Sequence, residues 1–261
     1  MEEILEIPLV HGRFICNYLL KELQTLPEVK ISDDVKILTV VGEGQKSGCV
    51  LKKSNLLNTE ITFIEVNKYI KFISKIEGLK NYIEKNYDEL PEYILYMDGF
   101  DTLIINNLDN PSKILKDYNC KMLFNATPGY YSNTGVAQNY TDTKKYNELL
   151  LDMKDSFLKK NHKKFNLSKD NNTSLNAGIF IGEKEFFLKI IKEAYDLMSS
   201  DHRKGFPYGS TCDQNVLKYL QNKYFDYICI DIYKKCMLWG HEKTIEKQDS
   251  IFSIGYNRIE K

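Results

Sequence analysis

Short apolar runs alternate along the chain with longer segments in which apolar residues recur every three or four positions. The apolar runs, rich in β-branched and aromatic residues, predict strands, and the periodic segments predict helices. The predicted strands cover residues 35–44, 61–67, 92–105, 120–128, 174–182 and 227–233. The predicted helices cover residues 47–58, 71–85, 111–117, 183–198 and 212–224.

This alternation of strands and helices predicts an α/β fold, in which βαβ units build a mostly parallel sheet flanked by helices. We expect residues 1–30 to form a partly helical lead-in and residues 31–261 to form one domain. A polar segment at about 129–172, rich in Tyr, Asn, Lys and Asp, predicts an insertion. A length of 261 residues suits one large or two small domains, and one is favoured because no long linker separates two halves.

Composition narrows the classes of partner. The chain carries 36 basic and 36 acidic residues, so its formal net charge is zero, whereas proteins that hold nucleic acid usually show a basic field. No stretch approaches the roughly 20 apolar residues that span a bilayer. We therefore expect neither a nucleic-acid partner nor a membrane span, and we leave the oligomeric state open.

The N-terminus and the cysteines indicate the compartment. The first residues, "MEEILEIPLV", carry acids where a secretory signal has its positive region, which favours a cytoplasmic location. The six cysteines are scattered, with neither CxxC pairs nor spacing suited to zinc, and predict free thiols: Cys16, Cys49, Cys120, Cys212, Cys229 and Cys236.

Two aspartates interrupt the apolar segment "YILYMDGFDTLII" at 93–105. Open α/β sheets bind ligands outside the carboxyl ends of their strands, and Gly99 lets the chain turn so that Asp98 and Asp101 converge there. A carboxylate pair inside a core would cost several kcal/mol unless it were paired or protonated. The pair is therefore either a solvent-exposed turn or a site for Mn²⁺ or Mg²⁺, ions that take one or two carboxylates together with phosphate oxygens.

An apolar strand, Asp-x-x-Asp and a second apolar segment together resemble the metal-binding motif of GT-A glycosyltransferases. More specifically, the chain resembles the glycosyltransferase domain of the procollagen lysyl hydroxylase family and the procollagen galactosyltransferases, with a more distant similarity to glycogenin-like enzymes. The segments that carry the resemblance follow the family's order over residues 35–257: "ILTVVGEG", "SKIEGLKNYIEKN", "MLFNATP", "SLNAGIFIG", "TCDQNVLKYL" and "ICIDIYKKCMLW". The resemblance implies a GT-A, Rossmann-like fold.

The resemblance also implies roles for individual residues. Asp98 and Asp101 would bind the metal ion, and Asp213 would bind hydroxyl groups or act as general base. Residues expected to contact the donor nucleotide are Thr39, Val40, Val41, Gly42, Lys75 and Gly99. Residues expected to line the sugar end of the pocket are Asn176, Ala177, Gly178 and Gln214.

Three of these assignments have structural alternatives. Lys75 is also typical of an exposed helix lysine, and Asp213 of an N-terminal helix cap. The segment Asn176–Gly178 is also typical of a glycine-marked strand inside the sheet.

The sequence departs from the family pattern at three places. Cys212 replaces the first acid of Asp-Asp-Gln, and Ala126-Thr127 stands where a glutamate is common. The C-terminal segment lacks the histidine that usually supplies a third metal ligand, and His241 is the candidate substitute. Water is the alternative at that position.

The resemblance therefore implies a metal-dependent hexosyltransferase. We expect it to use Mn²⁺ or Mg²⁺ and a UDP-sugar, UDP-glucose or UDP-galactose, and to act on a hydroxylysine-containing or other protein or glycan acceptor. Two alternatives stay open: a degenerate GT-A module that binds nucleotide sugar without turnover, and another metal-dependent enzyme that acts on nucleotides or phosphate esters.

Overall fold

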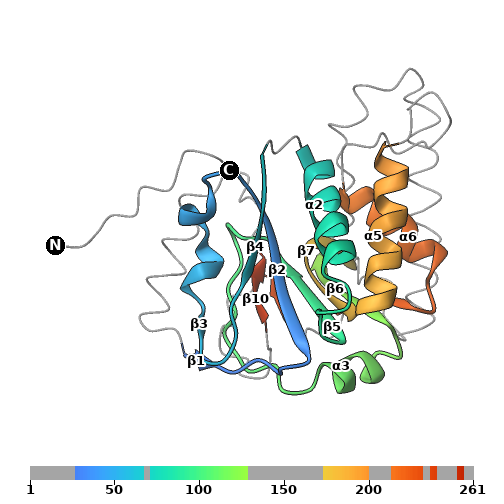
Figure 1. Cartoon of the computed structure of the whole chain (residues 1–261). Coiled ribbons are helices and arrows are strands. Elements are labelled where there is room, and N and C mark those ends of the chain that lie inside the picture. Colours follow the sequence, from blue (N-terminus) through green and yellow to red (C-terminus); the bar gives the residue numbers. More distant parts are fainter. Residues whose placement is uncertain are drawn as a thin grey trace, which may run out of the picture.

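A six-stranded mixed sheet forms the centre of the protein (Figure 1). The structure, a computed structural model, describes residues 27–67, 71–128, 173–199, 213–231, 236–239 and 252–255. In spatial order the sheet consists of β4 (Thr62–Val66), β2 (Val35–Gly42), β5 (Tyr93–Met97), β7 (Thr173–Glu183), β6 (Met122–Pro128) and β8 (Ile228–Ile230). The α/β fold expected from the sequence is thus confirmed.

The directions of the strands decide which residues share an edge of the sheet. β2 pairs in parallel with β4 and β5, and β6 pairs in parallel with β8. β7 is antiparallel to both of its neighbours, β5 and β6, so the sheet is mixed. As a result, the amino-terminal half of β7 lies at the same edge as the carboxyl ends of β5 and β2.

Four helices are described. α2 (Lys71–Lys85), α5 (Lys184–Ser199) and α6 (Asp213–Lys223) lie together on one face of the sheet (Figure 1), and α3 (Pro111–Asp117) follows β5. α3 begins where the sequence predicts, because Asn110 accepts a hydrogen bond from the Lys113 backbone N–H and Pro111 occupies the first turn. All four helices agree with the predicted ranges to within one residue at each end.

The segment 47–58 is not the predicted helix. It forms two short 3₁₀ turns, η1 (Lys46–Gly48) and η2 (Val50–Lys53), followed by the strand β3 (Asn55–Leu56), which pairs in parallel with β1 (Glu28–Val29). Cys49, with φ −72° and ψ 122°, is extended between the two turns and breaks the helical path. The apolar spacing was compatible with a helix, but the backbone hydrogen bonds are those of turns.

Two apolar clusters cover the two faces of the sheet. The cluster beneath α2, α5 and α6 includes Tyr96, Phe124, Phe180 and Phe187. The Phe180 ring contacts the other three rings. The opposite cluster includes Met237, from the small parallel pair β9 (Met237–Trp239) and β10 (Phe252–Gly255). Both faces of the central strands are buried, which explains their continuous apolar sequences.

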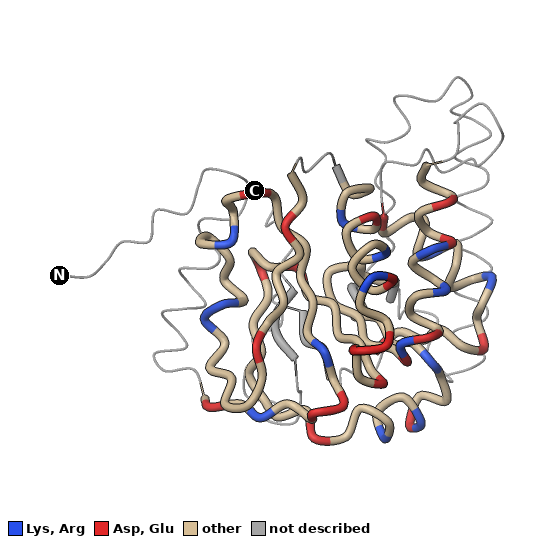
Figure 2. Tube along the Cα trace, viewed as in Figure 1, with Lys and Arg blue, Asp and Glu red and all other residues tan. Residues whose placement is uncertain are grey.

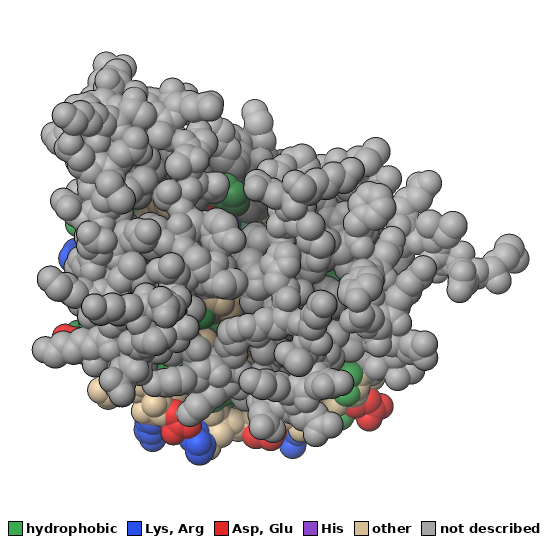
Figure 3. Space-filling model, turned by 180° about the vertical axis from the view of Figure 1, so that it is seen from behind, with side chains coloured by type: hydrophobic (Ala, Val, Ile, Leu, Met, Phe, Trp, Pro, Cys, Tyr) green, Lys and Arg blue, Asp and Glu red, His purple; other side chains and the backbone are tan. Residues whose placement is uncertain are grey.

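Charged residues of both signs are interspersed along the described trace (Figure 2), and both signs are also visible at the lower edge of the opposite view (Figure 3). Within the described part of the chain, no helix is long and apolar enough to cross a bilayer. The predicted lead-in up to residue 26 and the predicted insertion at 129–172 lie outside the described residues.

Candidate active site

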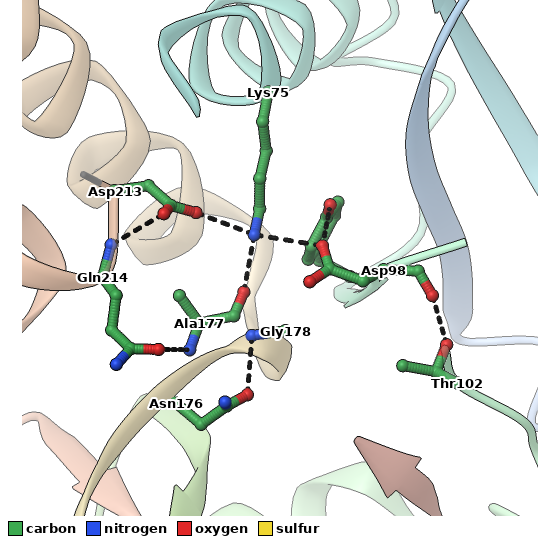
Figure 4. Close-up of polar contacts among 9 residues, drawn as sticks. Lys75, Asp98, Thr102, Asn176, Ala177, Gly178, Asp213 and Gln214 are labelled. Atoms are coloured by element: carbon green, nitrogen blue, oxygen red, sulfur yellow. Dashed lines mark hydrogen bonds and ion pairs between the residues drawn. The ribbon is translucent and has the colours of Figure 1, made fainter. Parts of the chain in front are cut away.

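A buried lysine joins three elements at the carboxyl-terminal edge of the sheet (Figure 4). The Lys75 ammonium of α2 lies 3.1 Å from Asp98 Oδ1 and 2.8 Å from Asp213 Oδ2, and it donates a 2.7 Å hydrogen bond to the Ala177 carbonyl oxygen of β7. Only 3% of the lysine side chain is exposed, which rules out the exposed helix lysine that its sequence also allowed. An ammonium group has three donor hydrogens, so it can serve all three contacts.

Asp98 follows the last residue of β5 and is held on several sides. Its Oδ1 accepts a 2.6 Å hydrogen bond from the Tyr96 hydroxyl, and its backbone N–H donates to the Gly178 carbonyl oxygen at 2.8 Å. The Thr102 hydroxyl donates to its backbone carbonyl oxygen. The side chain of Asp98 is nevertheless 37% exposed, so the carboxylate lies at the surface of the edge rather than inside the core.

Asp101 stands three residues beyond Asp98 and is half-buried. Burial, followed by repulsion from the Asp98 carboxylate, raises the pKa of Asp101 to about 8, while Lys75 acts in the opposite direction. Two carboxylates that repel each other in this way are a fitting donor set for a hard divalent cation, because the cation removes the repulsion. The raised pKa of Asp101 is consistent with the predicted pairing of Asp98 and Asp101, which stays a prediction.

Asp213 opens α6 and is almost completely buried. Burial raises the pKa of the Asp213 carboxyl, and the Asp98 charge adds to this effect, whereas the ion pair with Lys75 lowers the pKa. Asp213 Oδ1 accepts a 2.8 Å hydrogen bond from the Gln214 backbone N–H, and Gln214 Oε1 accepts a 3.4 Å bond from the Ala177 backbone N–H. Asp213 therefore contributes to the start of α6 and also to the charged cluster.

Gly178 lets β7 approach Asp98 closely. A Cβ atom on Gly178 would lie 3.1 Å from Asp98 Oδ2 and 3.0 Å from Asn176 Oδ1. Asn176 in turn accepts a 2.8 Å hydrogen bond from the Gly178 backbone N–H. Asn176, Ala177 and Gly178 therefore belong to a strand of the sheet, β7, which was the structural alternative for this segment. They also adjoin the charged cluster.

Four of the residues expected to contact the donor nucleotide lie on β2, next to the turn at Gly99. A Cβ atom on Gly99 would lie 2.9 Å from Cys49 Sγ and 3.1 Å from Thr39 Oγ1, so Thr39 packs beneath the turn and is fully buried. Val41 also adjoins Gly99, at 3.5 Å from the same Cβ position.

Val40 faces the other side of β2 and packs beneath α2, 3.2 Å from the Cβ position of Gly78. Gly42 is capped by the Gln45 side chain, whose Oε1 accepts its N–H at 3.3 Å. The structure therefore does not bring the side chains of Val40 and Thr39 to an open surface.

Asp98 and Asp101 are the residues that the sequence predicts as ligands of a divalent ion. Among the described residues, no three His, Cys, Asp or Glu side chains form a metal-binding group. An ion held here would need further oxygen ligands from a bound phosphate or from water, as Mg²⁺ and Mn²⁺ commonly use. His241, the candidate third metal ligand, and Cys212, which replaces the first acid of Asp-Asp-Gln, lie outside the described residues.

One residue of the site was not singled out from the sequence. The Tyr96 hydroxyl donates to Asp98, and the Tyr96 ring lies 4.6 Å from the Lys75 ammonium. Its signal was its place two residues before Asp98 at the end of a predicted strand, where side chains two positions apart lie on one face.

Sequence comparisons found no matching family model and no matching curated protein.

Proposed function

We propose that this chain is a metal-dependent glycosyltransferase of the GT-A type. It transfers a hexose from a UDP-sugar, UDP-glucose or UDP-galactose, to a hydroxyl group of a protein or glycan acceptor. The segments that resemble the procollagen lysyl hydroxylase glycosyltransferase domain support this assignment, as does the open α/β sheet, whose ligand edge lies at the strand carboxyl ends.

The cluster around Lys75 is the observation that carries the proposal. Asp98, Asp213 and Ala177 come from three elements that are distant in sequence, yet all contact one buried ammonium group. Buried ion pairs are weak sources of stability, because desolvation offsets their attraction. Carboxyl groups with a raised pKa at a ligand edge, here Asp101 and Asp213, are more typical of a functional site.

The residues of the cluster have complementary tasks in such a transfer. Asp98 and Asp101 would hold a divalent ion, which supplies charge neutralisation of the donor diphosphate when it is bound. Lys75 holds the Asp98 carboxylate in place and adds positive charge on the side of the leaving group. Asp213 binds hydroxyl groups, and it accepts the proton of the acceptor hydroxyl if the reaction inverts configuration.

A ligand screen with a matched control tests the proposal. Thermal shifts would be measured with UDP-, GDP- and CDP-sugars, with and without Mn²⁺, alongside the release of UDP. We expect stabilisation by UDP-sugars that depends on Mn²⁺ and is lost in Asp98→Ala and Asp101→Ala. Asp109→Ala, an exposed aspartate in the segment between β5 and α3, is the control and should retain the shift.

The same screen separates the alternatives. Binding of UDP-sugar without release of UDP under any divalent ion would instead identify a binding module. Stabilisation by nucleoside triphosphates or phosphomonoesters alone would identify another metal-dependent enzyme. A metal-dependent shift that survives both aspartate substitutions would contradict the site.

A further inference from the structure

Asn125 is a polar side chain in the middle of a buried strand. It lies in β6 between Phe124 and Ala126, which both belong to the core, and its exposed fraction is 0%. Neither its side-chain oxygen nor its side-chain nitrogen has a hydrogen-bond partner among the residues that the structure describes. Buried amides are nearly always hydrogen-bonded, so an unpartnered one calls for a group that binds there.

The position of Asn125 in the sheet connects it with the sugar end of the candidate site. Phe124 pairs with Phe180, but the next residue, Asn125, pairs with Asn176. The intervening residues of β7, from Ala177 to Ile179, therefore bulge away from β6 at this point. Side chains of residues directly opposite each other share one face of the sheet, with Cβ atoms roughly 5 Å apart.

The strand partner of Asn125 adjoins the charged cluster. Asn176, opposite Asn125, accepts the Gly178 backbone N–H at 2.8 Å. The Cβ position of Gly178 is 3.0 Å from Asn176 Oδ1 and 3.1 Å from Asp98 Oδ2. Asn125 thus lies opposite Asn176, which in turn adjoins Gly178 beside the expected metal ligand Asp98, and irregularities in strand pairing are frequent beside active sites.

We propose that Asn125 is a specificity-determining residue that, with Asn176, binds hydroxyl groups of the donor hexose. The inference rests on the proposed function and names the part of the donor that this amide pair recognises. A carboxamide offers one acceptor and two donor hydrogens, which match neighbouring sugar hydroxyls that both donate and accept. A site built to bind hydroxyl groups discriminates strongly against ligands that lack them.

Binding of donor with and without its sugar tests this role. Dissociation constants for UDP and for the preferred UDP-hexose would be measured by calorimetry with Mn²⁺ in the wild type and in Asn125→Leu. We expect the constant for UDP to stay within about twofold and the constant for UDP-hexose to rise roughly 10-fold, the effect of losing one or two hydrogen bonds. The melting temperature should not fall, because leucine is of similar size and removes an unpartnered buried amide.

Gln221 of α6 provides the matched control. Its side chain is also fully buried, and among the described residues both of its polar atoms lack a partner. It stands eight positions after Asp213, about 12 Å along the helix at the usual rise. Gln221→Leu should leave both dissociation constants unchanged.

Several results would overturn the role of Asn125. An unchanged dissociation constant for UDP-hexose, or an equal weakening of UDP and UDP-hexose binding, contradicts it. A lower melting temperature with unchanged binding also contradicts it, because that result indicates a bound structural water. If Asn125→Leu does not fold, Asn125→Ala is judged by the same two constants. If the wild type binds neither UDP nor UDP-hexose with Mn²⁺, the proposed function itself is refuted. If the wild type binds both but Asn125→Leu changes neither constant, only the role of Asn125 is refuted.

Discussion

Replacing Lys75 by methionine tests whether its ammonium group holds the site together. The substitution keeps most of the aliphatic side chain and removes the charge that lies 3.1 Å from Asp98 and 2.8 Å from Asp213. Asp98 stays partly exposed and can be solvated. Asp213, with 4% of its side chain exposed, loses its counter-ion inside the protein.

The expected loss of stability follows from that imbalance. Removing one partner of a buried ion pair costs about 3–5 kcal/mol when the remaining charge stays buried. Because burial already raises the pKa of Asp213, this carboxyl can take up a proton, and we expect the lower end, about 3 kcal/mol. At roughly 2–4 °C per kcal/mol for a protein of this size, the melting temperature should fall by about 6–12 °C.

Scanning calorimetry at pH 7 would measure this loss, with Lys80→Met on the same helix as control. Lys80 pairs with Glu84 one turn away at a more exposed position, which is worth only about 0.3–0.5 kcal/mol. Adding Asp213→Asn to Lys75→Met should restore part of the stability, because the unpaired carboxylate is gone. A Lys75→Met protein as stable as Lys80→Met, or strictly additive losses in the double variant, would show that the Lys75 ammonium group does not hold the site together.

Three further outcomes follow from the same geometry. Gly178→Ala brings a methyl group to 3.1 Å from Asp98 Oδ2 and should raise the dissociation constant for Mn²⁺ with UDP roughly 10-fold in calorimetry; an unchanged constant would contradict the close approach. The pKa of Asp101, about 8 in the folded protein, exceeds the value of about 4 for an unfolded chain, so the folded state holds an extra proton between these values. The metal-free protein should therefore lose stability as the pH rises from about 4 to about 8, and thermal unfolding of Asp101→Asn should lack that part of the slope. Burial raises the pKa of the Cys49 thiol to about 11, so iodoacetamide at pH 7.5 should modify Cys49 more slowly than half-buried Cys120, as peptide mass spectrometry would show; equal rates would argue against this burial.

The helices and strands were largely predictable because their signals are local. α2 and α3 have the predicted bounds, since helical spacing and, at α3, a cap and a proline mark them. The direction of β7 was not predictable from its apolar run, because a strand buried on both faces has the same composition in either direction. The helix predicted for residues 47–58 was wrong for a different reason. A few apolar residues can match a helical spacing by chance, and Cys49 is extended in the structure.

The candidate site was predictable residue by residue rather than as an assembly. Asp98 and Asp101 stood out as charges in an apolar segment, and Asp213 through the family pattern. That Lys75 joins Asp98 to Asp213 depends on the packing of α2 and α6 on the sheet, which no local pattern encodes. The signal for Asn125 was present in "MLFNATP", as a polar residue within an apolar strand, but only the structure gives its burial and its partner strand.

Binding of Mn²⁺ in the presence and absence of UDP shows whether Asp98 and Asp101 hold a metal ion together with the donor nucleotide. Electron paramagnetic resonance would follow the free ion as the wild type, Asp98→Ala, Asp101→Ala and the exposed control Asp109→Ala are titrated. We expect weak binding that UDP strengthens in the wild type and in Asp109→Ala, and the loss of UDP-dependent binding in the other two variants. Mn²⁺ binding that is indifferent to UDP, or equal in all four proteins, would contradict a metal-dependent nucleotide-sugar site at Asp98 and Asp101.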